Sequence, residues 1–294
     1  MKKIFQNLYG ELRSGWAIAI ALIVMIAAQL IARPISELGD ENDPVFKLMV
    51  TFVYGLIAIG GILLSFKLLY KRSFRLLGFI PDKGGSAFIC GLVSGTFSIW
   101  AVFFLLIAMG QAKIIQVNMG KLFSLSVVAE FISVCFFMFS EELLARGFFM
   151  TAMKTTRNKP VILFVPAVIF ALLHFMNPDM TVLSLLNTFL AGVLFGCMFI
   201  KSGALWLSTG FHVAWNFFVG DIFGMKTSGT EQASVLTTAM GENALLTGLP
   251  NGPDASIFTT GVLLLAIAIV HIMIKKPKHS IWMLDSDLPL TRGK

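Results

Sequence analysis

Long apolar runs alternate with short polar segments along the whole chain. Eight of these runs approach or exceed about 18 residues, the helix length that crosses about 30 Å of hydrocarbon. The runs are 15–32, 48–69, 86–109, 122–153, 160–176, 181–200, 203–223 and 257–274. This pattern predicts an all-α, polytopic membrane protein with about eight transmembrane helices. No soluble domain is apparent, so residues 1–294 are expected to form a single integral membrane domain.

The Lys and Arg residues predict how these helices are oriented. With the N-terminus in the cytoplasm, the cytoplasmic segments contain 17 of the 23 cations and the outer segments contain five. Membrane proteins concentrate positive charge in their cytoplasmic loops. Both termini are therefore predicted to be cytoplasmic, including the cations between Lys275 and Lys294. The first run, preceded by Lys2 and Lys3, is predicted to be a retained anchor rather than a cleaved signal peptide.

Composition narrows the class of protein further. Apolar residues make up 56% of the chain and charged residues 13%, with a mean hydropathy of +0.83 and a net charge of +7. These values exclude a disordered chain and argue strongly against an ordinary soluble domain. The cations form no basic patch, so membrane lipid is the expected partner and nucleic acid is not. The short loops and the charge bias favour a bacterial inner (plasma) membrane.

Charged residues interrupt the fourth run. Glu141 and Glu142 are adjacent, and Arg146 lies four residues after Glu142, on the same face of a helix. Charge inside hydrocarbon is costly and marks a functional site by default. Glu142 and Arg146 are expected to pair, and a buried ion pair that only stabilises the bundle is the structural alternative. Glu141 points about 100° away from Glu142 and is expected to be free to act as a general base or acid.

Two other runs carry polar residues at a similar depth. Phe170 and His174 lie one turn apart in the fifth run, and His212 and Asn216 in the seventh. At about 1.5 Å per residue, Glu141, His174 and His212 lie roughly 20, 21 and 16 Å from the predicted cytoplasmic boundary. A helix end for His174 and a helix contact for His212 and Asn216 are the structural alternatives. The common depth favours one polar pocket.

An acid, two imidazoles and a carboxamide in such a pocket suit the hydrolysis of an amide. Glu141 would take a proton from water or hold a metal that activates it, and Asn216 would hold the oxyanion. Glu141, His174 and His212 could ligate a divalent metal such as zinc with one open position, and a site without metal is equally consistent. Proton- or ion-coupled transport and a non-catalytic immunity or scaffold protein are the alternative functions.

Three motifs resemble those of a known family. Glu141-Glu142-x-x-x-Arg146, Phe170-x-x-x-His174 and His212-x-x-x-Asn216 occur in this order on three apolar runs. They are similar to the signature of the CPBP (Abi) intramembrane proteases, which include type II CAAX prenyl endopeptidases and bacteriocin-processing and immunity proteins. The resemblance covers residues 122–224, the expected catalytic core.

The resemblance implies an intramembrane endopeptidase that acts on a peptide or protein substrate, lipidated or not. It implies that Glu141 is the catalytic glutamate, that His174 acts with it on the water, and that His212 and Asn216 stabilise the oxyanion. Glu142, Arg146 and Phe170 would be supporting residues of the same motifs. The family has been described as metalloproteases, and a glutamate mechanism without a metal is also compatible with the resemblance.

Four further features of the sequence lie outside the three motifs. Glu130 lies about 13 Å from the outer boundary and is expected to line the cavity or to face an internal water, outside the catalytic set. Residues 224–256 are expected to form a short cap or a mobile loop. The pairs Gly91/Gly95 and Gly192/Gly196 have the spacing of closely packed helices. Cys90, Cys135 and Cys197 lie in apolar runs and are expected to be small buried apolar residues rather than members of a disulfide framework, with metal binding as a remote alternative.

Overall fold

The computed structural model describes residues 2–6, 12–40, 43–80, 84–156, 158–230 and 234–274. Each predicted apolar run coincides with a helix. The helices are α2 (Ser14–Ser36), α3 (Pro44–Tyr70), α4 (Gly84–Ala108), α6 (Leu125–Glu142), α8 (Lys159–Leu173), α9 (Val182–Ser202), α10 (Trp206–Phe217) and α12 (Ile257–Met273). The predicted cytoplasmic cations from Lys275 to Lys294, and with them the C-terminus, lie outside the described residues.

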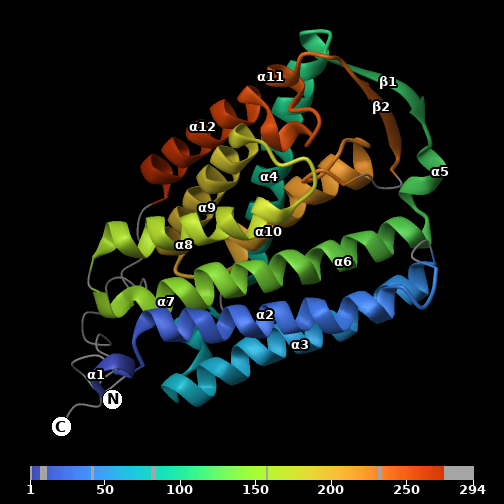
Figure 1. The fold of residues 1–294 in the computed structure, drawn as a ribbon. Coiled ribbons are helices and arrows are strands. Elements are labelled where there is room, and N and C mark those ends of the chain that lie inside the picture. Colours follow the sequence, from blue (N-terminus) through green and yellow to red (C-terminus); the bar gives the residue numbers. More distant parts are fainter. Residues whose placement is uncertain are drawn as a thin grey trace.

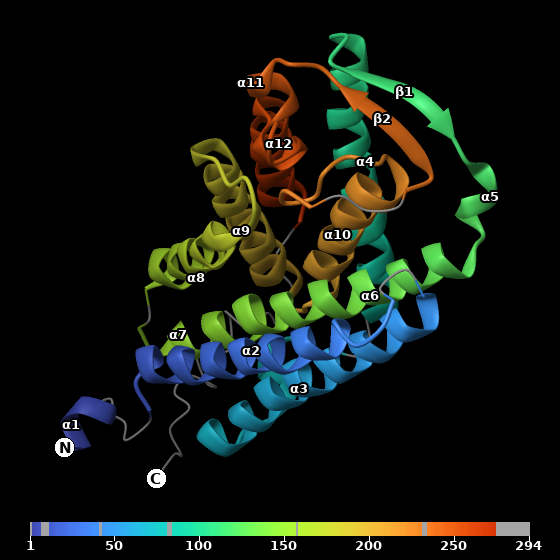
Figure 2. The same cartoon turned by 45° about the vertical axis from the view of Figure 1, so that its right-hand side comes forward.

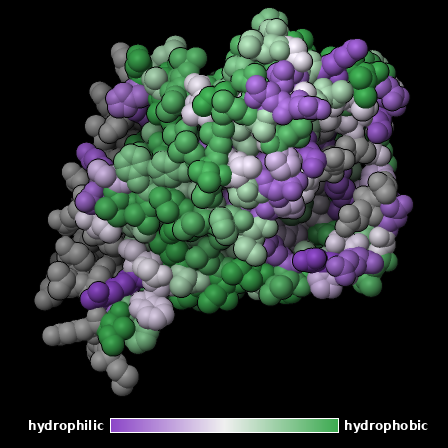
Figure 3. Space-filling view, turned by 45° about the horizontal axis from the view of Figure 1, so that its top comes forward, coloured by the Kyte–Doolittle hydropathy of each residue, from purple (hydrophilic) through white to green (hydrophobic). Residues whose placement is uncertain are grey.

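Among the described residues, five helical segments are long and apolar enough to cross a membrane. They are α2, α3, α4, α9 and the segment Lys159–Met176, in which α8 continues into η5 (His174–Met176). Helix α12 is apolar but shorter. Many large hydrophobic side chains are exposed, and Figure 3 shows them covering much of one face of the molecule. An integral membrane protein is consistent with these features, while the number of eight spans and the orientation of the termini stay predictions.

The helices pack as two groups around separate apolar cores. One core is built from α2, α3, α8 and η3 (Leu143–Phe149), the other mainly from α4, α9, α10 and α12. Helices α2, α3 and α6 lie side by side and cross the base of the second group (Figures 1 and 2). A polar site can therefore form where the groups meet, because neither apolar core occupies that space.

The unusually long fourth run forms one continuous helical segment with a change of pitch. Helix α6 continues into η3, a π-helix, and then into α7 (Met150–Met153). The hydroxyl of Ser124 accepts a hydrogen bond from the backbone N–H of Val127 and so caps the start of α6. π-Helical turns inside α-helices are frequently found at functional sites. Here the wider turn contains Arg146 and directly follows Glu141 and Glu142.

The all-α prediction is wrong in one detail, because the structure contains a two-stranded antiparallel sheet. Strand β1 (Ala112–Val117) follows α4, and strand β2 (Leu236–Met240) lies within the 224–256 segment. That segment also forms α11 (Ala244–Thr247) and η7 (Pro253–Ala255), so its described part has an ordered fold. Figure 2 shows the two strands at the edge of the helical bundle, where they tie this segment to the end of α4. Two such short strands, far apart in the sequence, leave no periodic signal.

Close helix packing at the small-residue pairs is confirmed. A methyl group on Gly91 would lie 2.2 Å from the Leu207 carbonyl oxygen, and one on Gly210 would lie 2.2 Å from the Phe88 carbonyl oxygen. Helices α4 and α10 therefore touch backbone to backbone. In the same way, a methyl group on Gly192 of α9 would lie 3.0 Å from Ala167 of α8. These contacts fix α10, which carries His212, and α8, which leads to His174.

The glycine contact predicts the effect of adding one methyl group. Gly91→Ala should destabilise the protein by about 1–3 kcal/mol, because the added carbon meets backbone that cannot turn away. Gly85→Ala on the same helix is the matched control, since its methyl group would meet nothing within 4 Å. Thermal unfolding of both variants in detergent measures the difference. Equal melting temperatures for the two variants would contradict the close packing of α4 on α10.

Candidate active site

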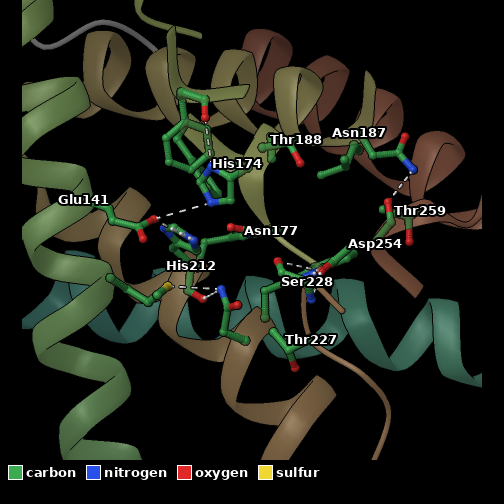
Figure 4. A pocket seen from close by; sticks show the side chains of 18 of the residues that line it. Glu141, His174, Asn177, Asn187, Thr188, His212, Thr227, Ser228, Asp254 and Thr259 are labelled. Atoms are coloured by element: carbon green, nitrogen blue, oxygen red, sulfur yellow. Dashed lines mark hydrogen bonds and ion pairs between the residues drawn. The ribbon is translucent and has the colours of Figure 1, made fainter. Parts of the chain in front are cut away.

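The structure brings Glu141, His174 and His212 together from three different helical segments. The Oε2 atom of Glu141 lies 4.0 Å from Nε2 of His174 and 3.9 Å from Nε2 of His212. Figure 4 shows the carboxylate on α6 pointing at both imidazole rings. The side chains of Glu141 and His174 are 29% and 18% exposed, and that of His212 is 8% exposed. The three groups thus meet at one partly enclosed point.

His174 sits where α8 changes into the turn η5. Its Nδ1 is 2.8 Å from the carbonyl oxygen of Phe170, one turn earlier. A carbonyl oxygen only accepts, so this contact assigns the proton to Nδ1. In the neutral ring the lone pair of Nε2 then faces Glu141. His174 therefore both bonds a backbone carbonyl at a helix end and lies in the pocket. The bond to the carbonyl holds the ring so that its Nε2 faces Glu141.

Glu142 and Arg146 form a buried ion pair beside this point. Nη1 of Arg146 donates to Oε1 of Glu142 at 2.8 Å, with the two side chains 2% and 0% exposed. The same carboxylate oxygen lies 3.2 Å from Nδ1 of His212. Since the ionised carboxylate can only accept, His212 donates from Nδ1. Glu142 is thus the group that orients the His212 ring, and Arg146 compensates its charge.

Arg146 is held by aromatic rings as well as by Glu142. Its guanidinium carbon lies 4.4 Å from the ring centre of Phe170 and 4.9 Å from that of Phe195. Nη2 donates to the carbonyl oxygen of Gly192 at 3.3 Å. A weakly hydrated cation between two ring faces is favourable when it is removed from water. Phe170 thus contacts both the arginine and His174, whose ring centre is 4.6 Å away.

Asn216 faces the same cavity one turn beyond His212. Its Nδ2 donates to the carbonyl oxygen of His212 and to the sulfur of Met138, both at 3.1 Å. A thioether sulfur is a weak acceptor. One amide hydrogen can therefore be transferred to a stronger acceptor in the cavity at little loss.

Glu141, His174, His212 and Asn216 line one cavity, which has a volume of about 240 Å³. Sequence reasoning missed most of its polar lining, which comes from α9, from the 224–256 segment and from the start of α12. These additional residues are Asn187, Thr188, Thr227, Ser228, Thr230, Asp254 and Thr259, together with Asn177 after η5. Asn187 was detectable as an amide in an otherwise apolar run, a costly placement in hydrocarbon. The loop residues gave no signal, because only the fold brings them over the pocket.

Asp254 connects the 224–256 segment to α10. Its Oδ1 accepts from Nε1 of Trp215 at 2.9 Å, and its Oδ2 accepts from the backbone N–H of Ser228 at 3.0 Å. The segment therefore lies over the cavity as a cap. The lining segments after α8 and after η6 (Phe218–Ile222) are those that the charge bias predicts to be outside the cytoplasm.

Glu130 does not belong to this cavity. It forms an ion pair with Lys47 of α3 and is absent from the residues that line the pocket. The expectation that it lines the cavity is therefore wrong, while its contact with an internal water stays a prediction. Its partner lies 83 positions away in the sequence, so the pairing depends on how α3 packs against α6.

The three candidate metal ligands have the chemistry of a zinc site but not its spacing. Both imidazoles bond through Nδ1 to an oxygen, as zinc ligands do. Donors about 2.0–2.1 Å from one tetrahedral ion lie about 3.3 Å apart. The separations of 3.9 and 4.0 Å from Glu141 are wider. Among the described residues, no group of three or more His, Cys, Asp or Glu side chains is arranged to hold a metal ion.

Among the described residues, two buried carboxylate oxygens of the site have no hydrogen-bond partner, Oε2 of Glu142 and Oε2 of Glu141, and the second of these faces both histidines. Oε2 of Glu141 is buried and makes no hydrogen bond to any described residue. A buried carboxylate oxygen without a donor is costly. A water molecule within hydrogen-bond distance of Glu141 and His174 fits their 4.0 Å separation and would supply the missing donor.

Comparison with known proteins points to one family. Residues 96–218, which contain all three motifs, match the family model Rce1-like, described as type II CAAX prenyl endopeptidase Rce1-like. The chain is also similar to the uncharacterized protein YyaK of Bacillus subtilis (strain 168), with 28% identity over 191 residues. This alignment covers 60% of the chain and 62% of YyaK, so it spans less than two thirds of that relative. No solved structure matches the chain. The central part of the chain is thus similar to the type II CAAX prenyl endopeptidases, as its motifs predict.

Proposed function

We propose that this protein is a membrane-embedded endopeptidase in which Glu141 activates a water molecule for attack on a peptide bond. The convergence of Glu141, His174 and His212 from three helical segments carries the proposal, because the buried Glu141 oxygen has no donor of its own. The match of residues 96–218 to a family of prenyl endopeptidases supports peptide hydrolysis as the reaction.

The first step is the activation of water. The water donates one hydrogen to Glu141 and one to the Nε2 lone pair of His174, 4.0 Å from the carboxylate. Both acceptors are held in place, Glu141 by α6 and His174 by its bond to the Phe170 carbonyl. As the water oxygen bonds to the carbonyl carbon, Glu141 accepts the proton. General base catalysis of this kind contributes about 10²–10⁴-fold to a rate.

The second step is the stabilisation and collapse of the tetrahedral intermediate. Asn216 offers an amide hydrogen that otherwise contacts only the sulfur of Met138. His212, when protonated, donates from both ring nitrogens, with Nδ1 held by Glu142 and Nε2 turned to the cavity. These donors receive the oxyanion. The carbon–nitrogen bond then breaks, and the leaving amine takes the proton from Glu141, which returns as a carboxylate.

The pair Glu142–Arg146 supports this chemistry without touching the substrate. Glu142 fixes which nitrogen of His212 faces the cavity, and Arg146 keeps Glu142 compensated inside the apolar core. Glu142 is thus analogous to the carboxylate that orients a catalytic imidazole in hydrolases.

The substrate we propose is a peptide or a membrane-associated protein, prenylated substrates being one class among those that the family similarity suggests. With the orientation predicted by the charge bias, the loops that line the cavity would lie outside the cytoplasm. A bacterial inner membrane remains the proposed location.

The proposal predicts that Glu141→Gln abolishes proteolysis. The amide keeps the shape of the carboxylate but cannot take a proton, so the rate should fall about 10²–10⁴-fold. The measurement compares new peptide N-termini in membranes from cells that express the wild-type chain or the variant. His174→Ala should remove the same set of cleavages.

Glu130→Gln is the matched control for this loss. It makes the same chemical change on the same helix but at the ion pair with Lys47. Cleavage should continue in this variant. Cleavages that survive in Glu141→Gln would end the proposal, and ion flux lost without any proteolysis would favour the transport alternative.

The buried pair predicts a separation of stability from activity. Arg146→Met leaves Glu142 charged and buried without its guanidinium partner and should cost about 3–5 kcal/mol, whereas the double variant Glu142→Gln/Arg146→Met should recover most of that loss. Activity should not return, because His212 has lost its carboxylate. The exposed pair Arg33–Glu37 is the control, and Arg33→Met should change stability by less than about 1 kcal/mol. Full activity of the double variant would contradict the orienting role of Glu142.

The wide spacing of the candidate ligands predicts that the activity does not require zinc. The purified protein should contain less than one equivalent of zinc by mass spectrometry. Its rate should change by no more than about twofold after dialysis against a chelator, in contrast to a metal-dependent fold or site. A rate that falls with chelation and returns with added Zn²⁺ would show that the three donors close around an ion.

A further inference from the structure

A second cavity reaches the same catalytic pair from the opposite side. It has a volume of about 160 Å³ and lies between α2 and α8, over the start of η3. Its own lining is Leu22, Met25, Ile26 and Gln29 of α2, Leu144 and Ala145 of η3, and Leu173 of α8. It shares Glu141, Phe170, His174 and Asn177 with the first cavity. Glu141 and His174 therefore stand between two chambers.

Gln29 is the one long polar side chain in the middle of the apolar helix α2. It is exposed, and it makes no hydrogen bond within the part of the chain that the structure describes. An amide without a partner in an apolar environment is costly. Gln29 lies about 22 Å along α2 from Ser14, a depth close to that of Glu141. A polar ligand at the depth of Glu141 and His174 would therefore stabilise the Gln29 side chain.

We infer that the groove between α2 and α8 is the second half of the substrate site and that Gln29 binds the substrate backbone there. This inference rests on the proposed function. A peptide lying across Glu141 and His174 would have one side of the cleaved bond in the groove and the other side in the first cavity. A side-chain amide can donate to and accept from one extended peptide unit. Such a unit would therefore pair with both the NH₂ group and the carbonyl oxygen of Gln29.

The contrast between the two chambers defines the class of substrate. Apart from Gln29 and the shared residues, the groove is lined by Leu, Met, Ile and Ala side chains. The first cavity is lined on its far side by Asn187, Thr188, Ser228 and Asp254. The peptide should therefore be cut where an apolar, membrane-inserted segment meets a polar tail. A chain that is polar throughout would leave its groove half without hydrogen-bond partners other than Gln29.

The first test maps the cleaved bonds. Peptide N-termini that depend on Glu141 should lie within about three residues of an apolar-to-polar boundary, since an extended peptide advances about 3.3 Å per residue. A synthetic peptide spanning a mapped site then reports on Gln29. Gln29→Leu should raise KM about tenfold with little change in kcat, because the lost bond is made equally in the bound and transition states. Gln29→Asn should recover part of the affinity.

The matched control is Leu30→Ala, which changes the neighbouring residue outside the groove. It should leave KM unchanged. Glu141-dependent cleavage in uniformly polar segments, or a Gln29→Leu variant with the wild-type KM, would overturn the inference while the proposed function stands. If no Glu141-dependent cleavage exists, the proposed function fails and this inference fails with it.

A second test closes the groove reversibly. Ile26 of α2 and Leu173 of α8 line its two sides, and both are exposed. In a chain whose three cysteines are replaced by alanine, Ile26→Cys/Leu173→Cys joined by a thiol-cleavable cross-linker should lose cleavage and regain it on reduction. Recovery separates blocked access from misfolding. The control joins Lys47→Cys to Glu130→Cys at the ion pair and should stay active. Full activity of the cross-linked groove would contradict the inference.

Discussion

The buried ion pair between Glu142 and Arg146 determines the geometry on which the rest of the site depends. A carboxylate that is 0% exposed can remain ionised only with strong donors, and here it receives both the guanidinium and Nδ1 of His212. The guanidinium in turn contacts Phe170 of α8, Phe195 of α9 and the Gly192 carbonyl. One charged pair thus holds four helical segments in place relative to each other, namely the α6–η3 segment, α8, α9 and α10. The π-helical turn places Arg146 where it reaches these partners, and the glycine contacts let the helices approach closely enough to meet it.

This network leaves Glu141 as the adjustable element. Glu142 accepts from both Arg146 and His212 through its Oε1, whereas the buried Oε2 of Glu141 has no donor and faces two imidazoles. The site sits between two apolar cores, so a polar reactant can enter without disrupting either of them. Two chambers meet at the same carboxylate, and the residues that only the groove has are mostly apolar, whereas those that only the first cavity has include many polar ones. Position along the membrane normal and the change from apolar to polar lining would together select which bond reaches it.

The sequence was most informative where polar residues are rare. Glu141, Glu142 and Arg146 stand out in an apolar run, and the i,i+4 spacing alone predicts the pair that the structure contains. His174 and His212 were placed at one depth by counting residues along helices, and the structure brings them to one carboxylate. Features that depend on the tertiary fold were not predictable. Asp254 lies over the cavity only because β2, η7 and Trp215 hold its segment there, and Glu130 pairs with a lysine of a distant helix. Gln29 was visible as a polar residue but belongs to no motif.

The most direct test of the central claim is a double-mutant cycle between Glu141 and His174, measured as kcat/KM on a peptide that spans a mapped cleavage site. If both residues act on the same water molecule, Glu141→Gln/His174→Ala should be no slower than Glu141→Gln alone, because groups that act as a unit are strongly non-additive. Losses that simply multiply in the double variant would show that the two side chains act independently, and would contradict the shared site.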